Sequence, residues 1–418
     1  MSQRFSTALR TPLREHIEAL NHADIVIGIP SFQSGAAIVH VIKTVAEGLG
    51  KYYPGAKALI FVSDGGSTDD TREFAEQVEI DSFSIEKMVS IYRGIPGKGS
   101  GLRAIFEAAA FLKAEAMAVF DSDLVSITPK WVKNLLSPIA EGYDLVCPHY
   151  RRFKLDGTIT NTIAYNLTRA LYGQRVRQPI GGDFGVSRRL AKHYLDQDVW
   201  ETDVAKFGID IYMTVSAMVG GFAICQARLG AKIHGHKDPA NDLGPMFQQV
   251  VGTIFTLMEV HESFWQQIDG SQEVALTGEE VAQEAPAFAI DRSSLVEYFR
   301  MGYGNFSGVW KQILEPDDYE TYRRLVADDA ASELLLPLEA WVRTVYRYAA
   351  AFRVTLRQRI KLLSTMIPLY HARVASLINE LENMSSEEAE RHFEAQALLF
   401  EEMKGYLRSI WAQGGSNV

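Results

Sequence analysis

The sequence predicts an α/β layer fold, and two patterns carry that prediction. Up to about residue 250, short apolar segments typical of strands alternate with segments whose apolar residues recur at helical spacing. This alternation is typical of parallel strands covered by helices on both faces. Polar residues directly follow the predicted strands, and in such sheets ligands bind beyond the carboxyl ends of the strands. We therefore expect the functional site at that edge.

The predicted elements follow one another closely. A short amphipathic helix within residues 1–22 precedes the main fold. A helix is predicted after each of the first three strands, and the run at 211–225 is interpreted as a helix, a turn and a strand. The four leading strands are predicted at 24–30, 57–63, 87–92 and 116–120.

The sequence pattern changes after about residue 250, where the alternation of predicted strands and helices ends. Aromatic-rich helical segments at 335–352 and 385–413 suggest a second, helical domain. The predicted domains are an N-terminal helix at 1–22, an α/β domain at 23–266, an acidic linker at 267–288 and a helical domain at 289–418.

Composition excludes several classes of function. The formal charge of −10 argues against a general nucleic-acid binder, because neutralising phosphates needs clustered lysine and arginine. Cys147 and Cys225 lie in apolar segments interpreted as strands, so we expect reduced core residues. No apolar signal segment follows Arg4, Arg10 and Arg14, and no apolar run is long enough to cross a bilayer. We expect a cytoplasmic protein without stable membrane insertion.

Asp121-Ser122-Asp123, directly after the strand at 116–120, is the main candidate for a metal site. Two carboxylates separated by one residue at a strand end can both reach one hard cation, Mg²⁺ or Mn²⁺. Such a cation neutralises the charge that develops on a departing diphosphate. A histidine can complete the site, and His234 is the candidate. The structural alternatives are a capped turn and a solvated loop histidine.

Two loops are candidates for binding a nucleotide. Asp64 begins a Gly-rich turn between a strand and a helix, where it can accept a hydrogen bond from a base or ribose. Gly97-Lys98-Gly99 precedes a helix, so backbone N–H groups and the lysine ammonium can face a phosphate. An ordinary turn with good helix caps and a plain flexible loop are the alternatives.

Asp183 and Asp210 are the candidate catalytic carboxylates, because both lie beside glycines and apolar residues. Either could orient an acceptor hydroxyl or stabilise a cationic sugar centre. Each could equally cap a helix, and Asp210 precedes a helix-like run.

Together these segments resemble the GT-A glycosyltransferases, whose Rossmann-like domain binds nucleotide-diphosphate sugars. The resemblance spans roughly residues 24–260 in chain order, and the helical tail is only loosely similar to the mannosylglycerate synthases. Similarity to the glucosyl-3-phosphoglycerate synthases lies at 29–31, 63–71, 96–99, 120–124 and 150–152. Similarity to the related mannosylglycerate synthases lies at 178–183, 207–210, 232–234 and 242–246.

The resemblance implies a metal-dependent transferase that retains anomeric configuration without a protein nucleophile. The GDP- or UDP-hexose donor would sit on the metal held by Asp123 and His234, and Asp210, with Asp183 as a second candidate, would act on the acceptor. Nucleotide contacts would come from Pro30, Ser31, Asp64, Gly97, Lys98, Gly99, Asp121 and Ser122. Acceptor contacts would come from Thr158, Thr160, Gly181 and Gly182.

Two segments depart from the family pattern. Pro30-Ser-Phe-Gln-Ser-Gly35 stands where the family carries Pro-Ala-Leu-Asn-Glu-Glu, and Gly157-Thr-Ile-Thr160 lacks the arginine of Gly-Arg-Val-Thr. A guanidinium fork is the usual partner of an acceptor phosphate, whereas threonine hydroxyls suit a carboxylate or hydroxyls. We therefore expect D-glycerate to be preferred over 3-phospho-D-glycerate.

The predicted function is transfer of glucose or mannose to D-glycerate or a related small hydroxy acid, which yields a compatible solute or a polysaccharide precursor. The alternative is an inverting, family-2-like transferase that acts on a polyprenyl phosphate or a polysaccharide with Asp183 as base. A nucleotidyltransferase and a non-enzymatic nucleotide-binding regulator are the other classes considered. The sequence leaves open whether the aromatic-rich tail forms a homodimer.

Overall fold

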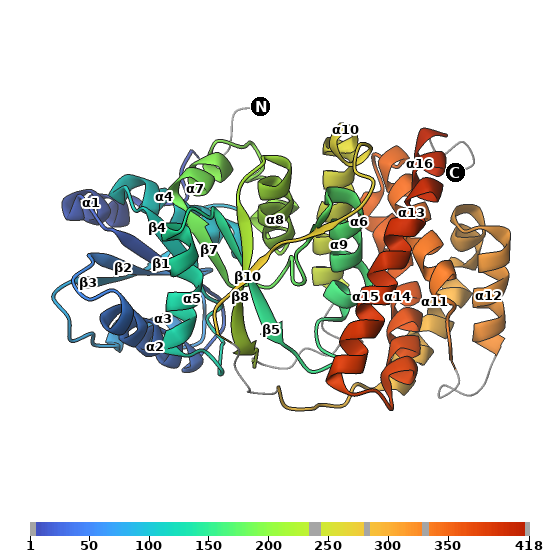
Figure 1. Cartoon of the computed structure of the whole chain (residues 1–418), viewed down its shortest axis with the longest axis horizontal. Helices are drawn as coiled ribbons and strands as arrows, with labels where there is room; N and C mark the ends of the chain where they lie inside the picture. Colours follow the sequence, from blue (N-terminus) through green and yellow to red (C-terminus); the bar gives the residue numbers. More distant parts are fainter. Residues whose placement is uncertain (1–5, 234–243, 280–284, 328–333, 414–418) are drawn as a thin grey trace. The chain divides into compact units, whose positions relative to one another are not determined.

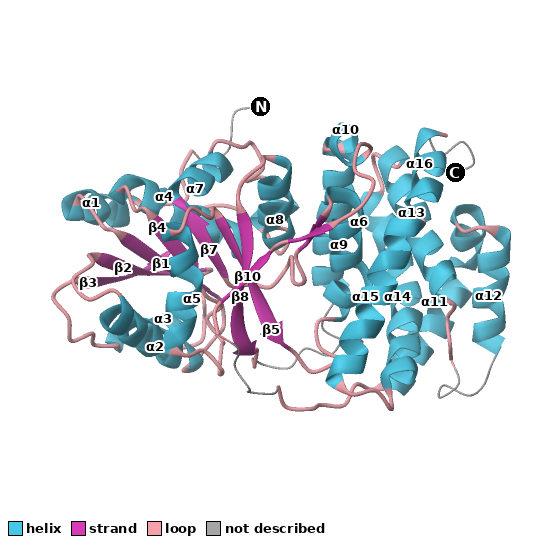
Figure 2. Cartoon of the chain, viewed as in Figure 1, coloured by secondary structure: helices cyan, strands magenta, loops and turns pink. Residues whose placement is uncertain are grey.

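The computed structural model describes residues 6–233, 244–279, 285–327 and 334–413. The chain forms two compact units, each assembled from separate segments. The first comprises residues 1–151, 176–235 and 274–285, and the second comprises residues 152–175, 236–273 and 286–418. Figure 2 shows strands and helices in the first unit and almost only helices in the second.

The described part of the first unit is built on an eight-stranded sheet of order β10-β8-β5-β7-β4-β1-β2-β3 (Figure 1). Strand β7 is antiparallel to β4 and β5, and the other neighbouring pairs are parallel. The strands are β1 Ile25–Ser31, β2 Ala58–Asp64, β3 Ile85–Ile91, β4 Ala116–Val119, β5 Leu145–Arg151, β7 Phe184–Ser187, β8 Ile224–Ala231 and β10 Ala275–Thr277. The predicted α/β class is confirmed. The antiparallel β7 was not predicted, because four residues are too few to show a period.

Helices cover this sheet and close its core. Side chains such as Ile27, Ile60, Phe120 and Val132 are fully buried between the layers. The helices are α1 Thr11–Leu20, α2 Ala37–Tyr52, α3 Thr71–Gln77, α4 Lys98–Leu112, α5 Pro129–Ala140, α7 Arg188–Leu195 and α8 Ile209–Val219, with a short 3₁₀ helix at Asp203–Ala205. Cys147 and Cys225 are free and buried, as the sequence predicts.

The second unit is helical, which confirms the predicted C-terminal helices. Its core is rich in aromatic side chains, among them Trp265 and Trp411, whose ring centroids lie 5.4 Å apart. The elements are a π-helix at Thr160–Ala164, α6 Tyr165–Tyr172, α9 Gly244–Val260, α10 Glu262–Trp265, α11 Arg292–Ile313, α12 Pro316–Ala327, α13 Leu338–Val354, α14 Arg359–Leu381, α15 Ser386–Glu402 and α16 Lys404–Ala412, with the strand pair β6 Gln174–Arg175 and β9 Gln272–Glu273.

The observed units divide the chain differently from the predicted domains. Residues 152–175 and 236–273 belong to the helical unit, although the sequence placed most of them in the α/β domain. The segment at 267–288, interpreted as a linker, contains β10, which pairs with β8 through residues such as Ala275 and Thr277. A three-residue edge strand with exposed side chains buries no apolar face, so its sequence gives no strand pattern.

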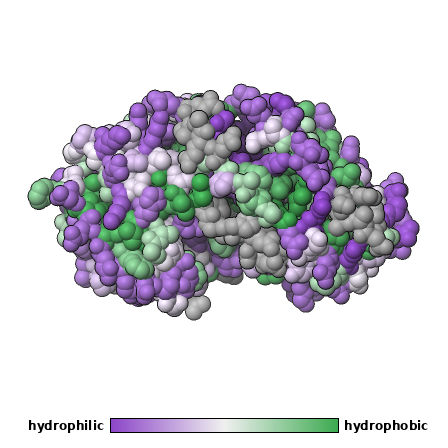
Figure 3. Space-filling model, turned by 90° about the horizontal axis from the view of Figure 1, so that it is seen from below, coloured by the Kyte–Doolittle hydropathy of each residue, from purple (hydrophilic) through white to green (hydrophobic). Residues whose placement is uncertain are grey.

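Within the part of the chain that the structure describes, no helix is long and apolar enough to cross a membrane. The face drawn in Figure 3 is largely hydrophilic, with apolar side chains gathered in smaller patches between the polar ones. Exposed apolar side chains of this kind are ordinary on folded proteins, so each needs its own argument before a role is assigned.

Candidate active site

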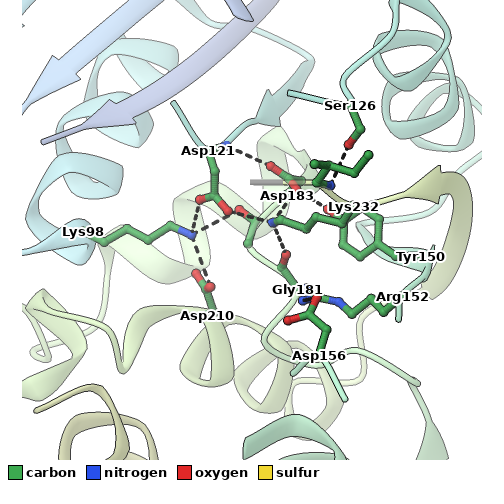
Figure 4. Close-up of polar contacts among 12 residues, drawn as sticks. Lys98, Asp121, Ser126, Tyr150, Arg152, Asp156, Gly181, Asp183, Asp210 and Lys232 are labelled. Atoms are coloured by element: carbon green, nitrogen blue, oxygen red, sulfur yellow. Dashed lines mark hydrogen bonds and ion pairs between the residues drawn. The ribbon is translucent and has the colours of Figure 1, made fainter. Parts of the chain in front are cut away.

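Asp121 stands at the centre of a cluster of charged side chains in the first unit. It follows β4 and lies at the carboxyl edge of the sheet. Lys98 Nζ lies 2.8 Å from its Oδ1 and Lys232 Nζ lies 2.8 Å from its Oδ2. Figure 4 shows the two lysines approaching the carboxylate from opposite sides. Although burial opposes ionisation, the Lys232 and Lys98 ammonium groups hold the pKa of Asp121 well below its usual range.

Asp210 joins this cluster through Lys98. Its Oδ2 lies 3.2 Å from Lys98 Nζ, which also donates to the backbone oxygen of Gly182 at 3.2 Å. The other oxygen, Oδ1, is buried and has no hydrogen-bond partner among the described residues. Burial raises the pKa of Asp210 against the influence of Lys98. Asp210 therefore has one buried acceptor position that no described residue fills, although 12% of its side chain is exposed.

Asp183 lies inside the cluster and contacts several of its members. Its side chain is fully buried, and its Oδ1 accepts the Asp121 backbone N–H at 2.8 Å. Its Oδ2 accepts from the Tyr150 hydroxyl and lies 2.9 Å from Lys232 Nζ. Burial raises the pKa of Asp183. No part of the Asp183 side chain is exposed, and in this structure its carboxylate bonds to the Asp121 backbone and to Lys232.

Lys232 is a site residue that the sequence analysis did not select. Its ammonium also donates to the backbone oxygen of Gly181 at 2.8 Å and lies 5.1 Å from the centre of the Tyr150 ring. It follows β8 directly, so its position after a buried strand, two residues before the candidate ligand His234, was an available signal. A lysine this buried needs carboxylate and carbonyl partners, which only the tertiary structure brings together.

Gly181 and Gly182, predicted to bind the acceptor, contact the cluster through their backbone. Gly182 has φ +93°, and a Cβ there would come within 2.3 Å of Asp121 Oδ2. At Gly181 a Cβ would come within 2.2 Å of the Pro148 side chain. Both glycines are therefore required so that this loop can pass close to Asp121.

The proposed metal ligands are only partly described. Asp123 is half-buried, and within the described ranges no hydrogen bond or ion pair engages its carboxylate. No cluster of three acidic, histidine or cysteine side chains occurs in those ranges, but His234 lies outside them. The backbone oxygen of Ile233, which precedes His234, accepts from the Val125 N–H, and the Ile233 N–H donates to the Ser126 hydroxyl, each at 2.9 Å. The chain thus leaves the described part of the first unit beside the loop of Asp123, whose carboxylate is a ligand type that hard divalent cations prefer.

Asp64 and Ser31 occupy the ends of neighbouring strands β2 and β1. Asp64 is buried, and its two oxygens accept from Ser31, the Gly66 and Ser67 backbone N–H groups and the Ser67 hydroxyl, at 2.7–2.8 Å. These contacts fill the acceptor positions of the carboxylate. Asp64 therefore stabilises the turn that follows β2, while Pro30 is part of the buried strand β1.

In the Gly97–Gly99 loop, the backbone N–H groups of both glycines already have partners within the protein. Gly97 N–H donates to the Tyr92 hydroxyl at 2.8 Å, and Gly99 N–H donates to the backbone oxygen of Lys206 at 3.2 Å. A Cβ on Gly99 would lie 1.9 Å from the Val204 oxygen, so this glycine permits close backbone packing. The ammonium of Lys98 also has partners inside the protein, namely Asp121, Asp210 and the backbone oxygen of Gly182. Ser122, also predicted to bind nucleotide, is buried with its hydroxyl 2.6 Å from that of Ser34.

Thr158 and Thr160, the other predicted acceptor residues, belong to the second unit. The Thr158 hydroxyl lies 2.5 Å from the Tyr370 hydroxyl and is buried. Thr160 begins the π-helix, an irregular turn that is frequent at functional sites. Thr158 thus has a structural partner, and Thr160 is the better candidate of the two for a substrate contact.

The family model described as Glycosyl transferase family 2 matches residues 26–199. Relatives named glucosyl-3-phosphoglycerate synthase, from Mycobacterium tuberculosis and Mycolicibacterium smegmatis, are 27% identical over 257 residues and 26% identical over 254 residues. Each match covers 57% of this chain, and the matches cover 75% and 79% of the two relatives. Residues 26–199 of the chain thus carry a glycosyltransferase domain. The resemblance predicted from the sequence motifs is thereby confirmed.

Solved structures similar to this glycosyltransferase include two complexes of glucosyl-3-phosphoglycerate synthase from Mycobacterium tuberculosis. The complex with Mg²⁺ and uridine diphosphate is 26% identical, covers 58% of this chain and 82% of that chain, and has a TM-score of 0.44. The complex with Mn²⁺, UDP-glucose and phosphoglyceric acid is 23% identical, covers 62% of this chain and 89% of that chain, and has a TM-score of 0.44.

Proposed function

We propose that this glycosyltransferase moves a hexose, glucose or mannose, from a UDP-sugar to a small hydroxy acid of the glycerate type, with retention of anomeric configuration. The observation that carries the proposal is the convergence of Lys98 and Lys232 on Asp121, with Asp210 beside Lys98. The names of the relatives, glucosyl-3-phosphoglycerate synthases, support the donor and acceptor classes.

Each residue has a proposed task in the transfer. Asp123 and His234 would hold a divalent cation, which when bound supplies positive charge to the departing diphosphate. The Lys98 ammonium donates hydrogen bonds to diphosphate oxygens, and this charge-assisted contact strengthens as negative charge develops there. Lys232 keeps the Asp121 carboxylate in place while Lys98 serves the diphosphate.

Asp210 acts on the acceptor. Its side chain is 12% exposed, unlike that of Asp183, so its carboxylate can accept the hydrogen of the acceptor hydroxyl and orient the hydroxyl oxygen toward the anomeric carbon. The proton then passes to an oxygen of the departing diphosphate, as retention without a protein nucleophile requires. The burial of Asp183 disfavours the inverting alternative, since that reading needs Asp183 as an accessible base.

A donor-by-acceptor screen with NMR of the product tests the proposal. UDP-glucose, UDP-mannose and GDP-mannose are each combined with D-glycerate and 3-phospho-D-glycerate in the presence of Mg²⁺ or Mn²⁺. We expect product from a UDP-hexose, with an anomeric proton of the same configuration as the donor. An inverted product would contradict retention, and no transfer to either acceptor would contradict the acceptor class.

A further inference from the structure

Four aliphatic side chains of the second unit are strongly exposed in two segments, the end of α9 and the connection between α13 and α14. Val354 ends α13, Leu356 lies in the connection and Ile360 lies in the first turn of α14, with exposed fractions of 39%, 77% and 67%. Val260, the last residue of α9, is 65% exposed. Single exposed aliphatic side chains are ordinary, whereas a group of them at one place calls for an explanation.

Two ion pairs join these segments. Arg359 Nη2 lies 2.8 Å from Glu259 Oε1, and Arg353 Nη2 lies 2.9 Å from Glu262 Oε2. Glu259 and Glu262 flank Val260 in the sequence, so the end of α9 lies against the connection between α13 and α14. The four aliphatic side chains therefore belong to one region of the surface.

The same connection carries two further cations that the protein does not neutralise. Arg357 and Lys361 are exposed, and among the described residues no ion pair engages either side chain. The glutamates at the end of α9 are already paired with Arg353 and Arg359, so the positive charge stays uncompensated. We define the apolar–basic patch as the four aliphatic residues and these two cations, namely Val260, Val354, Leu356, Arg357, Ile360 and Lys361.

The charge around this patch restricts what can bind it. Leu398 of α15 is also exposed, at 43%, but Glu394 and Glu402 lie one helical turn before and after it. The chain has a formal charge of −10, so it can approach an anionic surface only through a locally basic face. A symmetric contact between two copies would bring Arg357 and Lys361 of both copies together, and this repulsion disfavours a second copy as the partner.

We propose that the apolar–basic patch binds the surface of an anionic phospholipid membrane. Exposed aliphatic side chains can enter the boundary between headgroups and acyl chains, while lysine and arginine beside them attract anionic headgroups. Such binding is peripheral and needs no membrane-spanning helix. It is independent of the proposed sugar transfer, since the patch contains none of the charged residues around Asp121.

Cosedimentation with phospholipid vesicles tests the patch. The wild type should bind phosphatidylcholine vesicles that contain about 20% phosphatidylglycerol more tightly than vesicles of phosphatidylcholine alone. Raising NaCl from about 0.1 M to about 1 M should weaken this binding, because salt screens the exposed charges. Leu356→Asp should lower the affinity for the anionic vesicles by about 10-fold or more, and so should the double variant Arg357→Gln/Lys361→Gln.

Matched controls make the same changes at exposed positions outside the patch. Leu398→Asp, and the double variant Lys43→Gln/Lys51→Gln in α2, should bind the anionic vesicles as the wild type does. A wild type that does not bind these vesicles would overturn the proposal, as would Leu356→Asp with an affinity within about twofold of the wild type. Self-association that Leu356→Asp abolishes, without vesicle binding, would overturn it by assigning the patch to a second copy.

The sugar-transfer assay separates this proposal from the proposed function. Leu356→Asp should transfer sugar in vesicle-free solution at the rate of the wild type, because the substitution lies outside the candidate active site. Loss of that activity in Leu356→Asp would overturn the assignment of the patch to membrane binding alone. A wild type that binds anionic vesicles but transfers no hexose would contradict the proposed function and support the patch.

Discussion

Both units bury charged side chains, and they do so in different ways. The lysine–aspartate cluster of the first unit consists of Lys98, Asp121, Asp183, Asp210 and Lys232. Among the described residues, one carboxylate oxygen of Asp210 has no hydrogen-bond partner, and 24% of the Asp121 side chain is exposed. The arginine–glutamate network of the second unit joins Arg373 and Glu380 of α14 to residues of α15. Both Glu380 oxygens are bonded there, by Arg373 and by the Ser376 hydroxyl.

The difference follows from which helices and strands supply the charged side chains. The network comes from two consecutive helices, with Gln396 accepting from Arg373 at 2.8 Å. The cluster comes from α4, α8 and three strand ends, and it faces the edge where ligands bind. A buried charge that the protein satisfies contributes to stability, whereas an incompletely satisfied one is available to a substrate. Substitutions in the cluster should therefore lower activity, and substitutions in the network should lower stability.

The largest expected effect belongs to Asp123. Asp123→Ala should lower kcat by about 10³-fold, because it removes an electrostatic contact to the group that stabilises the leaving diphosphate. The half-buried carboxylate has no partner among the described residues, so the midpoint of urea unfolding should stay within error of the wild type. EDTA should abolish the activity of the wild type. Full activity in EDTA, or in the variant, would remove Asp123 from the metal site.

Glu380 should show the next largest effect, on stability alone. Although burial opposes it, contacts with His392 and Arg373 lower the pKa of Glu380 from 4.5 to about 2. A lowered pKa in the folded state adds stability above about pH 4.5, and this is lost as the pH falls toward 2. Glu380→Gln should lower the free energy of unfolding by about 3 kcal/mol at pH 7 and by less at pH 3.

Urea titrations of wild type and variant at both pH values measure that difference. Glu382→Gln, an exposed position at the end of the same helix, is the matched control and should change stability by well under about 1 kcal/mol. A difference that does not shrink between pH 7 and pH 3 would show that Glu380 is not ionised in the network.

The next prediction concerns Lys98 and the affinity for the nucleotide. Lys98→Met should weaken the affinity for UDP by about 1–3 kcal/mol, the range for loss of a charge-assisted contact. Lys206→Met is the control, since among the described residues the Lys206 side chain pairs only with Asp203, in a partly exposed contact. Calorimetry that shows unchanged affinity in Lys98→Met would assign Lys98 to the internal ion pairs alone.

The smallest expected effect concerns the acceptor. D-glycerate should have a higher kcat/KM than 3-phospho-D-glycerate, and Thr160→Ala should raise the acceptor KM a few-fold more than the donor KM. Thr158→Val removes the contact with Tyr370 and should change stability more than either KM. Steady-state kinetics with both acceptors measures this. A clear preference for the phosphorylated acceptor would show that another basic residue serves its phosphate.

The sequence alone predicted most of the architecture that positions the site. Apolar runs and helical periodicity gave the four leading strands, because buried parallel strands are continuously apolar. The prediction failed for β7 and β10, which are too short or too exposed to carry a pattern. The unit boundaries also differ, since the helical unit gathers segments that are distant in the chain.

For the site, the sequence determined which polar side chains are present, and the tertiary structure decided which of them contact one another and which are buried. Asp121, Asp123, Lys98 and Asp210 are visible as polar residues at strand and helix ends, since local pattern encodes those ends. Only the fold closes Asp64 and Asp183 inside internal hydrogen bonds and brings Lys232 across the sheet to Asp121. Burial and partners separate a carboxylate that can act on a substrate from one that holds the site, and these depend on contacts between residues far apart in sequence.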